Sequence, residues 1–257
     1  MKKRLRRWLG RLAPKLEKIA IYWSENYLLG KRSRGLKFVE ASILIPLALW
    51  FKHNLGKTAG SRVVPLKVDI PARLQNLSLN SALELVRRAP KVTVVECYCR
   101  NKYQKCQAPR NNCLVFEEPV LVDDLNPVVQ ENPDFPKLKA ILEEAQSYGL
   151  LHQALFFPDP KTVYCICNCC ECCCLSFQVK NNGYKLLQKS PFMIEFNREN
   201  CVECGKCEKV CISKAIRLNE GVKIKLEDCL GCGLCEHSCT AGALNLVVKE
   251  DCASDDR

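Results

Sequence analysis

The sequence predicts an α+β protein in three parts. A basic helical arm covers residues 1–37, a cysteine-rich α/β domain covers 38–180, and a small domain with pseudo-two-fold symmetry covers 190–249. Three observations support this division: positive charge is concentrated in the arm, cysteine is concentrated in the two later parts, and residues 190–249 contain an internal repeat. A polar tail, residues 250–257, follows.

The N-terminal arm is amphipathic and basic. Residues 1–37 contain twelve Lys or Arg and only Glu17 and Glu25 as acids, so most of the net charge of +11 lies there. Apolar residues recur at three- and four-residue spacing, which predicts a helix that Pro14 should kink. Such a helix can lie on an anionic membrane surface, or pack on the protein's own body or a partner subunit. Nucleic acid is disfavoured as a partner because few aromatic residues interleave with the basic ones.

The sequence favours a cytoplasmic location. The apolar segment 41–51 is too short to span a bilayer. Arg6 and Arg7 are followed by neither a clean apolar stretch nor a cleavage site, which argues against export. A peripheral position at the inner face of the membrane is the alternative that the arm leaves open. In a reducing compartment, the twenty cysteines indicate metal binding rather than disulfides.

The middle region is expected to form a small α/β unit. Its predicted helices cover 81–89 and 137–148, and its predicted strands cover 91–96, 151–157 and 162–167. Pro90 should stop the first helix, and Gly149 should occupy the C-cap position of the second. A loop is expected around residues 117–134, which are rich in Pro, Asp and Asn.

Eleven cysteines gather in this region in two sets, and each set directly follows a predicted strand. They are Cys97, Cys99, Cys106 and Cys113, then Cys165, Cys167, Cys169, Cys170, Cys172, Cys173 and Cys174. Sites assemble at the carboxyl ends of strands in α/β folds, so the sets should meet if the strands are neighbours. Thiols this dense would oxidise if unligated, which favours an additional iron–sulfur cluster. Zinc or copper, and redox-active dithiols, are the alternatives.

The C-terminal domain contains two C-x2-C-x2-C-x3-C runs, the second offset by 28 residues from the first. This spacing is typical of two 4Fe–4S clusters, in which the fourth cysteine of each run binds the other cluster. The first cluster is therefore assigned Cys201, Cys204, Cys207 and Cys239, and the second Cys229, Cys232, Cys235 and Cys211. Zinc would instead favour C-x2-C pairs set well apart.

The repeat extends beyond cysteine. Gly205 matches Gly233, in loops where the backbone must approach inorganic sulfur closely. Each repeat, about 192–220 and 221–249, should form a strand, a cysteine loop, a helical turn and a second strand. Residues 219–221 should turn between the two repeats as a hairpin.

Residues 190–249 resemble the bacterial-type dicluster ferredoxins. The resemblance implies a ferredoxin-like dicluster domain and single-electron transfer. The family usually has proline after the last cysteine of each run, where this chain has Ile212 and Thr240. The chain also resembles uncharacterised ferredoxin-like proteins that join a C-x-C-R segment (97–100) and a C-N-C-C-x-C-C-C segment (167–174) to such a tail.

These observations predict an iron–sulfur electron-transfer protein that works with a redox partner or as a subunit of a larger redox system. A reductase with a cysteine-rich catalytic centre in the middle domain and a cluster-assembly or maturation factor are the alternatives. No dinucleotide fingerprint or phosphate loop predicts NAD, flavin or ATP, and no catalytic residue is assigned. A surface ion pair is slightly favoured for Arg100 over a hydrogen bond to a thiolate. His237 is expected to face solvent and Cys252 to be free.

Overall fold

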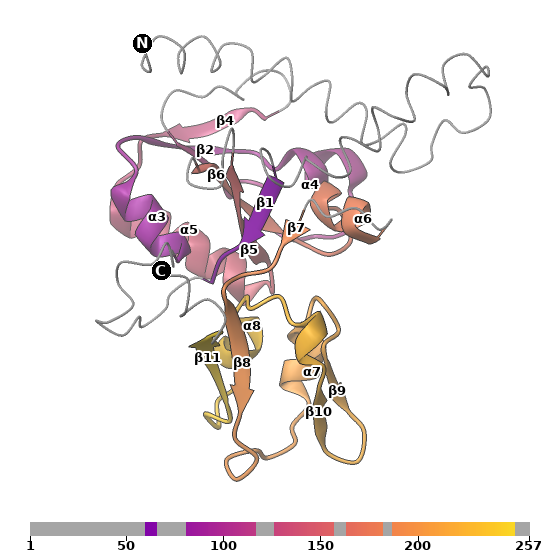
Figure 1. The fold of residues 1–257 in the computed structure, drawn as a ribbon. Helices are drawn as coiled ribbons and strands as arrows, with labels where there is room; N and C mark the ends of the chain where they lie inside the picture. The colour runs from indigo at the N-terminus through magenta and orange to yellow at the C-terminus, as the bar shows by residue number, and fades with distance from the viewer. Residues whose placement is uncertain (1–59, 66–80, 117–125, 157–162, 182–186, 250–257) are drawn as a thin grey trace, which may run out of the picture.

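The computed structural model describes residues 60–65, 81–116, 126–156, 163–181 and 187–249. The basic arm, the apolar segment 41–51 and Cys252 lie outside these residues. In the described part, a mixed sheet with its helices forms one body, and the smaller C-terminal domain extends from it (Figure 1). Helix and strand are both well represented, in agreement with the α+β prediction.

A seven-stranded sheet forms the middle domain, in the order β4-β2-β3-β6-β5-β1-β7. Its strands are β1 (Gly60–Val63), β2 (Val92–Val95), β3 (Cys113–Phe116), β4 (Val128–Glu131), β5 (Leu151–Phe156), β6 (Val163–Cys169) and β7 (Leu187–Gln188). Every pair is antiparallel except β1 with β7. The expectation of an α/β arrangement is therefore corrected, because short connections such as the one between β5 and β6 return the chain as antiparallel neighbours.

Two predicted helices cover one face of this sheet. The helices α3 (Ala82–Arg88) and α5 (Phe135–Ser147) pack through Val86 and Leu142 on Val94 and Ile166 of the sheet. Both helices begin at a side-chain cap: Ser81 Oγ accepts from Glu84 N at 3.2 Å, and Asp134 Oδ1 accepts from Lys137 N at 3.1 Å. Gly149, with φ of +70°, follows the C-cap of α5, close to its predicted role.

The other face of the sheet carries the thiols of β3 and β6. Along β6, Ile166 faces α3 and α5, whereas Cys165 and Cys167 point to the opposite side, as the two-residue period of a strand requires. The short helices α4 (Tyr98–Tyr103) and α6 (Leu175–Asn181) follow cysteine segments and were not predicted. The loop predicted around 117–134 is corrected in part, because β4 forms an exposed edge strand within it.

The C-terminal domain has the order of elements that the repeat predicts. These are β8 (Phe192–Phe196), α7 (Lys206–Val210), β9 (Ile216–Leu218), β10 (Val222–Ile224), the 3-10 turn η3 (Leu226–Asp228), α8 (Leu234–Ser238) and β11 (Leu244–Val248). The outer strands β8 and β11 pair antiparallel, and so do the inner strands β9 and β10. Each pair thus joins a strand of one repeat to a strand of the other, which gives the domain its two-fold character. The pairing of β9 with β10 confirms the hairpin predicted at residues 219–221.

The two domains share an apolar core. Val63 and Leu151 of the middle sheet pack with Leu230 and Leu234 of the second repeat. An ion pair at the surface, between Lys214 Nζ and Glu171 Oε1 at 3.1 Å, also joins the two domains. Within the described part of the chain, the helices are all too short or too polar to cross a bilayer.

Candidate metal centres

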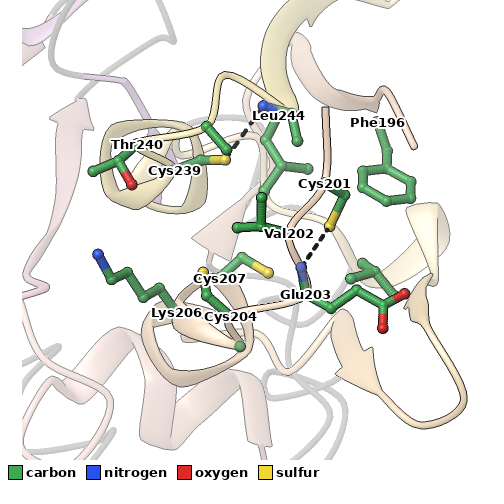
Figure 2. A pocket seen from close by; sticks show the side chains of 14 residues that line it. Phe196, Cys201, Val202, Glu203, Cys204, Lys206, Cys207, Cys239, Thr240 and Leu244 are labelled. Atoms are coloured by element: carbon green, nitrogen blue, oxygen red, sulfur yellow. Dashed lines mark hydrogen bonds between the residues drawn. The ribbon is translucent and has the colours of Figure 1, made fainter. Parts of the chain in front are cut away.

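The first candidate site is a cavity in the C-terminal domain (Figure 2). Its walls include Cys201, Cys204 and Cys207 from the first run and Cys239 from the second. Apolar side chains such as Phe196 fill the wall between the thiols. The empty space is about 390 Å³, including the mouth that opens to solvent. Thiols that are far apart in sequence thus surround one hollow.

A second cavity of matching size lies beside the second run. Cys229, Cys232 and Cys235 line it together with Cys211 of the first run, around about 370 Å³ of empty space that again includes the mouth. The fourth cysteine of each run therefore lies at the cavity of the other run. This is the crossed grouping that the spacing predicts.

The backbone of the cysteine loops is folded around the sulfur atoms. Gly205 and Gly233 adopt φ of +72° and +78° at the N-caps of α7 and α8. Backbone N–H groups point at the thiols: Glu203 N lies 3.4 Å from Cys201 Sγ, and Gly231 N lies 3.4 Å from Cys229 Sγ. Donors of this kind stabilise thiolates and cluster-bound sulfur. Four thiols at each cavity, with backbone N–H donors beside them, are the donor set that a 4Fe–4S cluster requires.

The two cavities differ in their surroundings. The first lies near solvent, since Cys204 is exposed and the side chain of Val202 is 71% exposed. At the second cavity, burial raises the pKa of Cys232 to about 12, and the nearby charges of Cys229 and Cys211 add to the effect. A thiolate in that environment requires a compensating positive charge, which bound iron supplies.

In the middle domain, four thiols meet in a compact group that we call the thiol quartet: Cys106, Cys170, Cys172 and Cys173. Their sulfur atoms all lie within 4.8 Å of one another. Cys106 Sγ is 3.6 Å from Cys170 Sγ and 4.0 Å from Cys173 Sγ, and Cys172 Sγ is 3.8 Å from Cys173 Sγ. Cys106 comes from the loop after α4, and the other three come from the turn between β6 and α6.

The other seven thiols form a line rather than a compact group, and we call them the thiol chain. Side-chain contacts connect them in the order Cys97, Cys113, Cys167, Cys169, Cys174 and Cys99, with Cys165 branching from Cys167 at 3.6 Å. The hydrogen bond that Cys97 donates to Cys113, together with burial, raises the pKa of Cys97 well above its usual value. None of the described cysteines forms a disulfide.

The two cysteine sets of the middle domain do meet, although not in the expected way. Strands β2 and β6 are not neighbours, because β3 lies between them. Cys113 is the first residue of β3, and Cys165, Cys167 and Cys169 lie within β6 rather than after it. The sheet-borne thiols thus come together across one face of an antiparallel sheet, whereas the quartet forms between the turn that follows β6 and the loop after α4.

Arg100 lies inside this thiol-rich region, so its assignment to a surface ion pair is wrong. The residue is 1% exposed, its Nη1 donates to the Asn168 carbonyl at 2.6 Å, and its Nη2 donates to Asn112 Oδ1. Burial lowers the pKa of Arg100, but the neighbouring thiolates, Cys97 foremost, raise it by more. No sequence signal distinguishes this arginine from a surface one. His237, by contrast, is exposed as predicted.

Comparison with known families bears on the C-terminal domain. Residues 200–243 match the family described as a 4Fe-4S dicluster domain, a segment that holds both cysteine runs. The C-terminal domain is therefore an iron–sulfur dicluster domain of the ferredoxin type, as the resemblance implies. A comparison of the chain with curated proteins finds no match.

Proposed function

We propose that the protein transfers single electrons through two 4Fe–4S clusters held in the C-terminal domain. The observation that carries this proposal is the pair of matched cavities, each lined by three cysteines of one run and the fourth of the other. When bound, a 4Fe–4S cluster accepts and returns one electron. The eight cysteines would hold the clusters, and the apolar walls would limit access of water.

The two cavities would have different roles because their surroundings differ. Val202 and Cys204 present the first cavity to solvent, so a redox partner can approach it closely. The second cavity faces the middle domain, where Cys232 packs against an apolar cluster that includes Cys169 and Cys174 of the thiol chain. The C-terminal domain would therefore connect a partner at its outer end with the middle domain at its inner end.

The thiol chain is the part of the middle domain best situated to exchange electrons with the second cavity. The additional iron–sulfur centre stays a prediction for the eleven cysteines of the middle domain. The reductase and assembly-factor alternatives, the partner's identity and a membrane contact of the arm also stay predictions.

Paired substitutions test the crossed ligand sets. Cys201→Ser and Cys239→Ser should remove the same cluster and leave the same EPR signal in the reduced protein. Cys229→Ser and Cys211→Ser should both remove the second cluster and leave the EPR signal of the first. Cys252→Ser, in the polar tail, is the control that should change neither. Each protein is reconstituted anaerobically and assayed for iron, acid-labile sulfide and the number of electrons released to ferricyanide.

The expected wild-type result is about eight iron atoms and two transferable electrons per chain, with the EPR spectrum of two interacting clusters. A content of about twelve iron atoms per chain would indicate the additional iron–sulfur centre in the middle domain. The crossed assignment fails if Cys211→Ser leaves the same spectrum as Cys201→Ser, because each run would then hold its own cluster. The electron-transfer proposal fails if the loaded protein releases no electrons.

A further inference from the structure

The thiol quartet has the dimensions of a site for one metal ion. A tetrahedral ion with metal–sulfur bonds of about 2.3 Å holds its four sulfur atoms about 3.8 Å apart. Three sulfur–sulfur separations within the quartet, 3.6, 3.8 and 4.0 Å, agree with this edge length. Among the residues that the structure describes, no other group of His, Cys, Asp or Glu was found gathered in this way.

A cubane does not fit between sulfur atoms at these separations. Each thiolate of a 4Fe–4S cluster binds a different iron, so the four sulfur atoms must stand farther apart than on a single ion. At the two C-terminal cavities the four thiols instead line a hollow, of about 390 and 370 Å³ with the open mouth included. In the quartet all four sulfur atoms lie within 4.8 Å of one another, and those of Cys106 and Cys170 are 3.6 Å apart. The same chain therefore contains thiols arranged for clusters and thiols arranged for one ion.

The quartet is half enclosed by apolar packing. Cys173 is fully buried and Cys170 nearly so, in one apolar cluster with Ala145 and Leu150, whereas Cys106 and Cys172 are half-buried. Lys105 N lies 3.4 Å from Cys173 Sγ, so the backbone supplies a donor to one sulfur. Four protein ligands in an apolar setting, without an open position, are typical of structural rather than catalytic metal sites.

The buried charge of Arg100 is an independent observation that points to an anionic centre. Arg100 is 1% exposed, and none of the described carboxylates pairs with it. Its Nε is buried without a hydrogen-bond partner among the described residues. Among the thiols, Cys97 and Cys113 of the thiol chain interact with it most strongly, and Cys169 and then Cys170 of the quartet follow. A buried cation requires compensating charge, and four thiolates on one divalent ion leave a net negative centre.

We propose that Cys106, Cys170, Cys172 and Cys173 bind a single tetrahedral zinc ion. Tetrahedral four-sulfur sites select zinc or iron–sulfur centres, and the close sulfur packing favours zinc. Zinc has no redox chemistry, so the ion does not carry electrons. It fastens the loop after α4 to the turn after β6, which are 64 residues apart between Cys106 and Cys170. This site is separate from the two clusters and does not depend on the electron-transfer proposal.

Metal analysis of the full-length, cluster-loaded protein tests the site. The wild type should contain about one zinc in addition to the iron of its clusters. Cys172→Ser should lose the zinc and retain the iron and the EPR spectrum of the C-terminal clusters. Cys165→Ser, in the thiol chain, is the matched control and should retain the zinc. Zinc at background level in the wild type, zinc retained in Cys172→Ser, or loss of iron in place of zinc would each overturn the proposal.

Two further measurements keep the test decisive if Cys172→Ser does not fold. Cobalt(II) bound to the wild type in place of zinc should show the intense visible bands of a tetrahedral four-thiolate site. Cys106→His keeps a zinc-ligating side chain, so it should retain about one metal ion and shift those bands. Cobalt spectra that are octahedral, or identical in wild type and Cys106→His, would contradict the assignment of the site.

Discussion

Replacement of Gly231 by alanine is expected to displace the loop that holds Cys229 and Cys232. The cause is a clash with a residue far away in the sequence. Gly231 lies between Cys229 and Cys232 with φ of +67°. A Cβ at this position would lie 2.1 Å from the carbonyl oxygen of Phe192 and 2.8 Å from its carbonyl carbon. These are backbone atoms of β8, which is held by its pairing with β11, so they cannot rotate away.

The magnitude follows from two contributions. A non-glycine residue in the left-handed region costs about 1–2 kcal/mol. Forcing extra volume into a packed interior costs about 1–3 kcal/mol more. The total of about 2–5 kcal/mol corresponds to a fall in the thermal midpoint of roughly 4–20 °C for a protein of this size. Displacement of the loop should also disturb the contact from Gly231 N to Cys229 Sγ, and with it the second cluster.

Gly242→Ala is the matched control. Gly242 has φ of +65°, but a Cβ there would meet no atom within 4 Å, so only the left-handed contribution of about 1–2 kcal/mol applies. Thermal unfolding of the cluster-loaded proteins, followed by circular dichroism at one scan rate, gives the two midpoints. EPR of the reduced proteins shows which cluster is affected. Equal midpoints for the two variants, with both cluster signals intact, would refute the close approach of Gly231 to Phe192.

Three further predictions concern buried and exposed charges. Burial lowers the pKa of His152 to about 4, so the unfolded chain binds a proton between pH 6.5 and pH 4 that the folded chain does not. Stability should therefore fall by up to about 1.4 kcal/mol per pH unit on acidification through this window, and His152→Gln should remove that share of the slope in urea unfolding. Arg100→Lys should lower the unfolding free energy by about 1–3 kcal/mol, because a lysine cannot satisfy both acceptors, and wild-type stability in urea would contradict this. Glu171→Gln breaks the exposed ion pair with Lys214 and should change the same free energy by less than about 1 kcal/mol, so a larger loss would mean that this contact is more than a surface pair.

Local features of the sequence determined the C-terminal domain. The cysteine spacing is short enough for one loop to surround one site, and the repeat carries its own turn signal at residues 219–221. Helix α3 and helix α5 were predictable for the same reason, since caps and breakers act within a few residues of the helix end.

Two equivalent positions of the repeat show a feature that local sequence does not explain. Glu203 and Gly231 occupy equivalent positions in the two runs, and both adopt positive φ, +51° and +67°. Glu203 is exposed, whereas Gly231 lies against the backbone of Phe192. The repeat identifies the two positions as equivalent, but only the packing of the second run against β8 explains why one of them requires glycine.

The grouping of the middle-domain thiols was decided by tertiary structure alone. Cys106 joins Cys170, Cys172 and Cys173 in the quartet, whereas Cys99 joins the thiol chain, although both come from the same sequence set. Arg100 is buried among them without a sequence signal that marks it as buried. Such contacts depend on strand order and on which face of the sheet each side chain occupies. Spacing along the chain specifies ligands that share a loop, but thiols from segments far apart in the sequence are brought together only by the fold.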